Sequence, residues 1–270
     1  MSIKLVAIDL DGTLLNSNHE VSEENKAAIK KAKEQGVKVV LVTGRPLKAM
    51  LHILEDCGLT EAGDIALTYN GGLVQWTQTG ETVRQIVFPK EDSLDIYKLS
   101  QDINLPCNFI DLDTVHEPPY PKGRPSQYQK VMNALPFEPI DMTALPEDFP
   151  INKIVYCWHQ EELDEAIKEI PEIYYERYNL IKSRPQLLEF MPKSIDKGKG
   201  LEFLSEILDI SVDDMMAIGD QENDLAMVLR AGTGVAMDNA VPAVKEAAQI
   251  ITKNNDAHGV GYAIEKYVLN

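Results

Sequence analysis

The sequence predicts an α/β protein with a doubly wound, Rossmann-like parallel-sheet core and an inserted α+β domain. Short apolar runs of β-forming residues alternate with helical patterns near both ends of the chain, and this alternation is typical of a parallel sheet covered by helices. In the middle of the chain, strand-like runs follow one another with fewer helices between them. We therefore expect a core formed by residues 1–84 and 190–270 and an inserted domain formed by residues 85–189.

The N-terminal segment predicts a βαβ unit. Residues 3–8 and residues 37–42 are short runs of apolar and β-forming residues, as in buried parallel strands. Between them, residues 22–35 carry apolar side chains at helical spacing, with Ser22 as the N-cap and Gly36 as the stop.

Later elements continue this pattern. We expect a helix over residues 46–58, with Pro46 as its first residue, and a strand over residues 65–69. Beyond the insertion we expect a helix at 201–208, a strand at 215–218, a helix at 224–230, a strand at 234–236 and a closing helix at 260–268. Within the insertion we expect strands at 85–88, 107–111, 154–158 and 187–191 and helices at 92–102 and 161–170.

Composition limits the partners. The chain has 270 residues, 44% of them hydrophobic, but no apolar run approaches the roughly 20 residues that a membrane span needs. The chain also begins directly with a strand pattern, so we expect a cytosolic protein with no membrane partner. Its net charge of −17 would repel nucleic acid. A phosphate site in such a chain needs local positive potential from a metal ion, a lysine or backbone amides.

The first candidate motif is Asp9-Leu10-Asp11-Gly12-Thr13, at the end of the first predicted strand. Ligands bind at the carboxyl ends of strands in open α/β sheets, and side chains two residues apart on a strand point to the same side. Asp9 could therefore attack phosphorus while Asp11 handles the proton of the leaving oxygen. The alternative is an Asp-Gly turn that only closes a strand.

The second motif, Thr43-Gly44-Arg45, follows the second predicted strand and precedes a predicted helix. A hydroxyl together with the free amides of a helix N-terminus suits a phosphoryl oxygen. Such a tripeptide alone is more often an ordinary loop, but its position relative to Asp9 favours a site.

The third motif is Lys197-Gly198, just before a predicted helix. A lysine there could neutralise both the Asp9 carboxylate and a phosphoryl group. Because Lys193 and Lys199 lie nearby, a solvated run of charge is the alternative.

The fourth motif, residues 219–224, is a carboxylate-rich loop after another predicted strand. Mg²⁺ prefers oxygen ligands and takes one or two carboxylates together with substrate phosphate. Asp9 and Asp220 could supply these carboxylates, so the sequence predicts Mg²⁺ as the cofactor.

Together, the four motifs resemble those of the haloacid dehalogenase (HAD) superfamily, and the resemblance covers the entire chain. The insertion between Thr43 and Lys197 resembles that of the Cof-type subgroup. Residues 68–72, 219–224 and 263–270 are most similar to the YidA-type sugar phosphatases.

This resemblance implies a phosphatase that forms an aspartyl-phosphate on Asp9, with Asp11 as general acid and then general base. Asp9, the backbone carbonyl of Asp11 and Asp220 would hold Mg²⁺. Asp224 would orient these ligands from outside the ligand shell of the ion. The groups implied for the phosphoryl oxygens are Thr43, Lys197, Asn223 and the backbone of Leu10 and Gly44.

The inserted domain is expected to select the substrate, a small phosphorylated metabolite such as a sugar phosphate. Arg45, Asn70 and Glu189 are possible substrate contacts, although Arg45 and Glu189 could equally form structural salt bridges. A phosphomutase of the same superfamily and a phosphoacceptor signalling module are the alternative functions. The sequence leaves the physiological substrate and the oligomeric state open.

Overall fold

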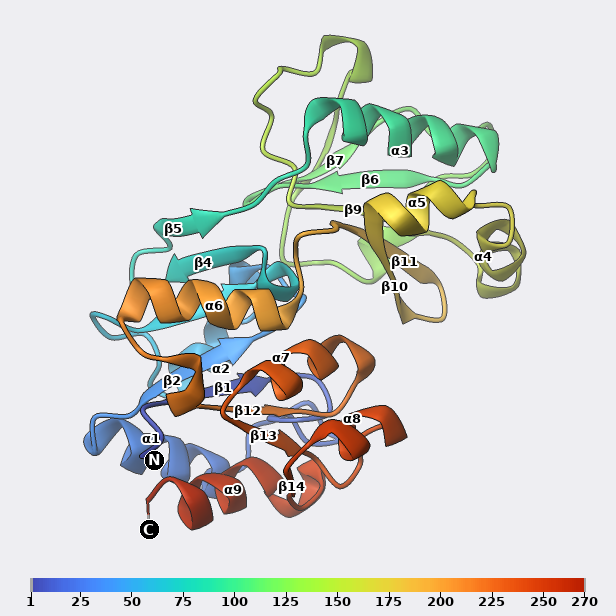
Figure 1. Cartoon of the computed structure of the whole chain (residues 1–270). Coiled ribbons are helices and arrows are strands. Elements are labelled where there is room, and N and C mark those ends of the chain that lie inside the picture. Colours follow the sequence, from blue (N-terminus) through green and yellow to red (C-terminus); the bar gives the residue numbers. More distant parts are fainter. Residues whose placement is uncertain (1, 270) are drawn as a thin grey trace. The chain divides into compact units, whose positions relative to one another are not determined.

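The computed structural model describes residues 2–269; Met1 and Asn270, the last residue of the 263–270 segment, lie outside them. The chain divides into two compact units, one formed by Met1–Gln85 with Asp196–Asn270 and the other by Ile86–Ile195 (Figure 1). The domain boundaries expected from the sequence, 1–84 with 190–270 for the core and 85–189 for the insertion, remain a prediction. No helix within residues 2–269 is long and apolar enough to cross a membrane.

Within its described residues, the first unit contains an eight-stranded sheet in the order β14-β13-β12-β1-β2-β3-β4-β5. Its strands are β1 Leu5–Asp9, β2 Lys38–Val42, β3 Ile65–Thr68, β4 Leu73–Trp76, β5 Thr82–Gln85, β12 Met215–Gly219, β13 Thr233–Ala236 and β14 Ile250–Ile251. β1 pairs in parallel with both β2 and β12, so the strand that ends at Asp9 lies inside the sheet. β4 and β5 extend one edge in antiparallel pairing, which the sequence did not predict.

Helices cover both faces of this sheet. They are α1 Glu23–Glu34, α2 Leu51–Asp56, α6 Lys197–Leu208, α7 Leu225–Arg230, α8 Pro242–Ala247 and α9 Gly259–Tyr267. Buried residues of α1 and α9 form one hydrophobic cluster with Val6, Ile8 and Ala66. Leu67 points to the opposite face, where α6 packs closely against it at Gly200.

Helix α1 forms as its sequence predicts. The side chain of Ser22 accepts a hydrogen bond from the backbone N–H of Asn25, two acidic residues occupy the first turn, and Gly36 adopts a φ of +82° beyond the end. The predicted helix over residues 46–58 is wrong in its first half. Pro46 is extended, with ψ at 154°, and precedes only a short 3₁₀ turn, Leu47–Ala49. The α-helix therefore begins at Leu51, away from Gly44.

The second unit, all of which is described, contains a six-stranded sheet in the order β10-β11-β9-β6-β7-β8. Its elements are α3 Lys90–Asp102, β6 Cys107–Ile110, β7 Val115–Glu117, β8 Phe137–Pro139, β9 Lys153–Cys157, α4 Gln160–Ile167, α5 Glu172–Arg177, β10 Tyr178–Arg184 and β11 Leu187–Pro192. The predicted strand at 85–88 is wrong, because the preceding strand already ends at Gln85 and Phe88 instead packs into this unit's own core. The fold is α/β, with a largely parallel core and an inserted α+β domain.

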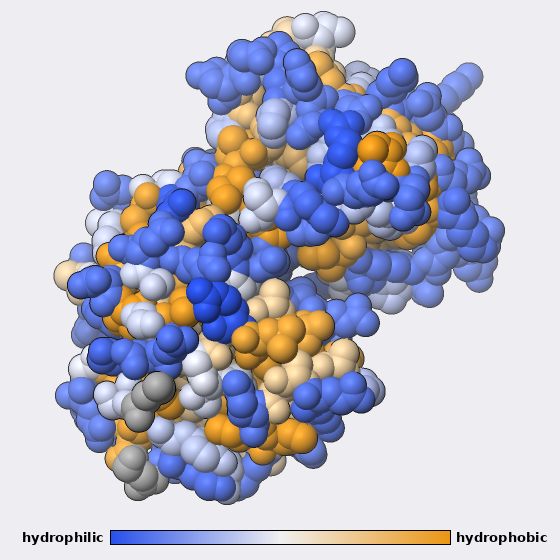
Figure 2. Space-filling model, viewed as in Figure 1, coloured by the Kyte–Doolittle hydropathy of each residue, from blue (hydrophilic) through white to orange (hydrophobic). Residues whose placement is uncertain are grey.

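The molecular face drawn in Figure 2 is covered mainly by hydrophilic residues, with smaller apolar areas between them. This surface agrees with the chain's 26% content of charged residues and its net charge of −17.

Candidate active site

Three carboxylates gather at the carboxyl ends of two neighbouring strands of the first unit. β1 ends at Asp9, and β12, its parallel partner, ends one residue before Asp220. Oxygens of Asp9, Asp220 and Asp224 lie within 4.8 Å of one another, and all three residues are buried. Parallel pairing thus brings together two motifs that are more than 200 residues apart.

Lys197, the first residue of α6, connects this cluster. Its Nζ atom donates hydrogen bonds of 2.6 Å to Oδ1 of Asp9 and 2.6 Å to Oδ1 of Asp224, and its side chain is 0% exposed. Asp196 caps the helix by accepting from the backbone N–H of Lys199. A Cβ atom at position 198 would lie only 2.6 Å from the carbonyl oxygen of Ala226, which explains the glycine there. The predicted Lys197-Gly198 motif is therefore a buried structural junction, not a solvated run of charge.

The carboxylate of Asp224 is held at both oxygens. Its Oδ1 accepts from Lys197, while its Oδ2 accepts from the backbone N–H groups of Asp220 and Gln221, each at 2.9 Å. Asp224 therefore orients both Lys197 and the loop that carries Asp220. This geometry suits the orienting role that the sequence resemblance implies.

Asp220 has two supports to which the sequence analysis gave no role. The hydroxyl of Thr13 donates to Oδ1 of Asp220 at 2.8 Å, and the side-chain amide of Gln221 donates to Oδ2 at 3.0 Å. Thr13 is fully buried. The sequence signal for a role of Thr13 was its place in the Asp-Gly-Thr motif. Its hydrogen-bond partner could not be predicted from that motif, because Asp220 lies 207 residues away.

Burial makes the charge of this cluster unfavourable. The pKa of Asp9 is raised to about 8, chiefly by burial and then by the nearby Asp224, despite the opposing effect of Lys197. Burial also raises the pKa of Asp220. Although burial alone would lower the pKa of Lys197, Asp224 and Asp9 hold it above its usual value.

The donor set fits a divalent cation. Three ionised carboxylates and one ammonium group carry a net charge of −2 (−3 + 1), which Mg²⁺ would balance. Carboxylate oxygens are also the ligands that Mg²⁺ prefers. The site therefore has the charge and the ligand chemistry for this ion.

Asp11 lies in a different environment from Asp9. β1 ends at Asp9, so the alternation of side chains along the strand does not extend to Asp11. The half-exposed Asp11 carboxylate accepts from Nε of Arg45 at 3.0 Å and from Nη2 of Arg45 at 2.5 Å. Arg45, a predicted substrate contact, thus holds both oxygens of the predicted general acid.

A strained turn lies beside the Thr43-Gly44-Arg45 motif. The φ angles are 50° at Tyr69, 53° at Asn70 and 101° at Gly71. The left-handed conformation costs about 1–2 kcal/mol for a residue such as tyrosine, but less for asparagine or glycine. The Asn70 backbone N–H donates to the carbonyl oxygen of Thr43 at 2.9 Å. Asn223 Nδ2 donates to Asn70 Oδ1 at 3.2 Å. The structure thus brings three predicted site residues together: Thr43, Asn70 and Asn223.

The Thr43 segment does not have the predicted helix N-terminus. Because Pro46 is extended and the next α-helix begins at Leu51, a helix dipole does not reach Gly44. The hydroxyl oxygen of Thr43 instead accepts from the Arg45 backbone N–H at 3.2 Å. At the first motif, Leu10 is buried and its carbonyl oxygen accepts from the N–H groups of Thr13 and Leu15.

Glu189 lies in the second unit, in β11, with 6% of its surface exposed. It accepts hydrogen bonds from Lys153 Nζ at 3.2 Å and from Ser183 Oγ at 3.0 Å. Glu189 therefore forms a structural salt bridge with Lys153, which was one of the two roles expected for it from the sequence. Its contact with a substrate stays a prediction.

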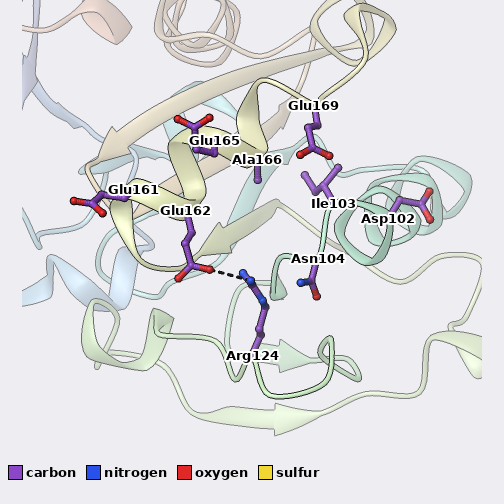
Figure 3. A pocket seen from close by; sticks show the side chains of 9 residues that line it. All are labelled: Asp102, Ile103, Asn104, Arg124, Glu161, Glu162, Glu165, Ala166 and Glu169. Atoms are coloured by element: carbon purple, nitrogen blue, oxygen red, sulfur yellow. Dashed lines mark ion pairs between the residues drawn. The ribbon is translucent and has the colours of Figure 1, made fainter.

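A surface pocket of about 460 Å³ in the second unit has an acidic lining (Figure 3). Its carboxylates come from the end of α3 and from the α4 region: Asp102, Glu161, Glu162, Glu165 and Glu169. Arg124 also lines it, but is paired with Glu162 at 2.9 Å. This lining would repel a phosphorylated anion, so we do not assign phosphate binding to it.

Buried carboxylates around a lysine at the ends of parallel strands are typical of phosphoryl-transfer sites that use a divalent cation. The chain belongs to the haloacid dehalogenase-like hydrolase family, whose model matches residues 6–264. It is 38% identical to YxeH of Bacillus subtilis (strain 168), which carries a provisional phosphatase name, over 98% of each chain.

Two further proteins are similar over almost their full lengths. The chain is 31% identical to the B. subtilis 5-amino-6-(5-phospho-D-ribitylamino)uracil phosphatase YcsE, over 100% of this chain and 97% of YcsE. The crystal structure of a haloacid dehalogenase-like hydrolase from Bacteroides thetaiotaomicron has a TM-score of 0.84 at 31% identity, covering 98% of this chain and 99% of the other. The family, the fold and a phosphatase type of activity are therefore established together.

Proposed function

We propose that this protein is a Mg²⁺-dependent phosphatase that hydrolyses phosphomonoesters of sugars or similar small metabolites through an aspartyl-phosphate on Asp9. The observation that carries the proposal is the buried Lys197 ammonium, bound to Asp9 and Asp224 within a triad of carboxylates. A structural salt bridge would need one carboxylate. The additional buried negative charge suits a divalent cation, whose positive charge would in turn attract a phosphoryl group.

Asp9 is the proposed nucleophile. Lys197 holds its Oδ1 atom, so Oδ2 attacks phosphorus, and the bond to the leaving oxygen breaks as the Asp9–phosphorus bond forms. Asp11 gives its proton to the leaving oxygen and then takes one from the water that cleaves the aspartyl-phosphate. Both Asp11 oxygens accept from Arg45, so Arg45 would compete with the leaving oxygen and the water for Asp11.

Other residues of the motifs bind and orient. Asp9, the backbone carbonyl of Asp11 and Asp220 would hold Mg²⁺, which would neutralise charge on the phosphoryl oxygens. The groups proposed to bind those oxygens are Thr43, Lys197, Asn223 and the backbone of Leu10 and Gly44. Asp224 orients Lys197 and the Asp220 loop through the contacts described above.

The similarity to YcsE supports the substrate class. The substrate in that protein's name carries its phosphate on a ribityl chain, which is polyhydroxylated as a sugar is. We propose a substrate with the same chemistry, a phosphate ester of an alcohol group on a small polyhydroxylated metabolite. Arg45, Asn70 and Glu189 remain the proposed contacts to its non-phosphate part.

Two other functions fit less well. A phosphomutase of the same superfamily would return the phosphoryl group to a sugar, so the identification of inorganic phosphate or an isomeric sugar phosphate as the product distinguishes it. A phosphoacceptor signalling module does not need an inserted unit such as Ile86–Ile195. A cytosolic location and the absence of nucleic-acid or membrane partners remain predictions from the sequence.

The test is phosphate release from a panel of sugar phosphates, polyol phosphates and nucleotides. We expect release to require Mg²⁺ and to be abolished by Asp9→Asn, with the fold intact by circular dichroism. Asp209→Asn is the matched control, because Asp209 is an exposed residue of the same unit in a left-handed conformation that asparagine also adopts. Full activity in excess chelator, or an active Asp9→Asn variant, would contradict the proposal.

A further inference from the structure

The turn after β3 has an unusual conformation for a buried segment. Two consecutive residues that are not glycine, Tyr69 and Asn70, adopt left-handed φ angles, although they are only 1% and 4% exposed. Such a conformation persists only where the surrounding structure holds it, and it occurs preferentially at functional sites. The contacts of this turn therefore indicate what the conformation serves.

The backbone of the turn lies between two parts of the candidate active site. On one side, the N–H of Asn70 donates to the carbonyl oxygen of Thr43 at 2.9 Å. On the other, a Cβ atom on Gly71 would lie 2.2 Å from the carbonyl oxygen of Asp196, the cap of the helix that begins with Lys197. The turn thus sets the spacing between the Thr43 segment and the start of α6.

The side-chain amide of Asn70 adds a third connection. Its Oδ1 atom accepts from Nδ2 of Asn223 at 3.2 Å. The same amide lies over Gly44, since a Cβ atom there would be 3.1 Å from both Nδ2 and Oδ1 of Asn70. The absence of a side chain at Gly44 gives the amide its room.

This hydrogen bond determines which end of the Asn223 amide is presented. The carbonyl oxygen of Asn70 accepts but cannot donate, so it selects the NH₂ group of Asn223 and not its oxygen. An NH₂ group has two N–H donors, and one remains for a phosphoryl oxygen. With the amide reversed, an oxygen would meet the anion and repel it.

We propose that Asn70 is a positioning residue of the phosphatase reaction, which acts through Asn223 and through the space above Gly44. This inference rests on the proposed function and gives Asn70 a role other than substrate contact. The left-handed turn places the Asn70 amide where it can fix the Asn223 donor.

The test is a double-mutant cycle measured as kcat/KM with p-nitrophenyl phosphate and Mg²⁺. Asn70→Gly keeps a residue that adopts the left-handed conformation but removes the amide, and we expect a loss of about 10- to 100-fold from the misplaced donor. In an Asn223→Ala background, Asn70→Gly should lower kcat/KM by less than about 3-fold, because the Asn223 amide that Asn70 positions is already absent. Equal losses in both backgrounds would show a structural effect and overturn the proposal.

Gly44 provides an independent test. Gly44→Ala should lower kcat/KM in the wild-type background because its Cβ atom displaces the Asn70 amide. In the Asn70→Gly background the amide is absent, so the added methyl group should have little further effect. A loss from Gly44→Ala that is the same in both backgrounds would contradict the geometry.

A matched control separates the local effect from a general one. Asn104, an exposed residue of the second unit, also has a left-handed φ, of 59°, and Asn104→Gly should leave kcat/KM unchanged. A wild-type protein that hydrolyses no phosphomonoester would refute the proposed function itself. An active wild type with an equally active Asn70→Gly variant would refute only the role of Asn70.

Discussion

Asp9 is 6% exposed and lies among two other carboxylates and one ammonium group. Burial and Asp224 raise its pKa to about 8 from an ordinary value of 3.8. Without a cation, the folded protein therefore binds a proton here at pH values where the unfolded chain has released it. The residue proposed to carry out the chemistry is thus also a source of instability in the metal-free protein.

The sign of this effect gives a prediction for pH. Between about pH 4 and pH 8 the folded state holds the Asp9 proton and the unfolded state does not, so stability falls as pH rises. Asp9→Asn cannot lose a proton, so at pH 8 we expect the metal-free variant to be more stable than wild type, by an amount on the order of a few kcal/mol. At pH 4 the two should be similar.

Urea unfolding in excess chelator at pH 4, 6 and 8 measures this difference. The difference between wild type and Asp9→Asn isolates Asp9 from the other titrating groups, and Asp209→Asn, which replaces an exposed carboxylate of the same unit, serves as the control. An Asp9→Asn variant whose stability parallels that of wild type across this range would show that Asp9 is ionised in the metal-free protein.

The sequence predicted the residue types of the candidate site better than their partners. One cluster contains four of the predicted residues, Asp9, Asp220, Asp224 and Lys197. Their positions could be predicted because strand ends and helix starts can be read from local sequence patterns. The pairing of Asp11 with Arg45 and of Thr13 with Asp220 depends on side-chain directions beyond the strands. Local periodicity carries no information about those directions.

At the scale of elements, the strength of local sequence signals again determined which helices and strands could be predicted. Helix α1 has a serine cap and a left-handed glycine, and it was predicted almost residue for residue. The antiparallel strands β4 and β5 and the short strand β14 were missed. Their pairing is determined by neighbours in the sheet, so their own residues give weak signals.

Helix α6 packs too closely against the sheet to admit a methyl group at Gly200. A Cβ atom there would lie 2.4 Å from Cδ2 of Leu67, which is fully buried, and 3.0 Å from Cα of Gly71. Alanine usually stabilises a helix interior by about 1 kcal/mol relative to glycine. For Gly200→Ala we expect the opposite, a net destabilisation of about 1–3 kcal/mol from overpacking.

Chemical denaturation of Gly200→Ala against wild type measures this change. Ser205→Ala is the matched control in the same helix, because Ser205 is only partly buried and alanine has the higher helix propensity. A stabilised Gly200→Ala variant would mean that α6 can move away from Leu67 at no cost.

At the scale of the whole molecule, each unit has its own hydrophobic core. One buried cluster joins α1, α2, α9 and the strands of the first sheet, whereas a separate cluster fills the second unit from Phe88 to Phe190. The carboxylate triad belongs entirely to the first unit. Mg²⁺ alone should therefore stabilise the two units unequally.

Hydrogen exchange measured by mass spectrometry, with and without Mg²⁺, resolves the two units. We expect slower exchange in peptides around β1, β12 and the start of α6, since a ligand at 100 times its Kd adds about 2.7 kcal/mol of stability. Peptides from the second unit should exchange at unchanged rates, and Asp9→Asn should weaken the response in the first. Equal protection of both units by Mg²⁺ alone would show that they unfold as one.

The interrupted first unit also has a consequence for biosynthesis. Leu5 in β1 pairs with Met215 in β12, 210 residues later (215 − 5), whereas the second unit is one continuous segment. At about 5–20 residues per second, a ribosome needs roughly 10–40 s to make the partner of β1 after β1 itself. During that time the inserted unit can fold on the ribosome, while β1 and β2 expose apolar edges that a chaperone such as a nascent-chain holdase would have to cover.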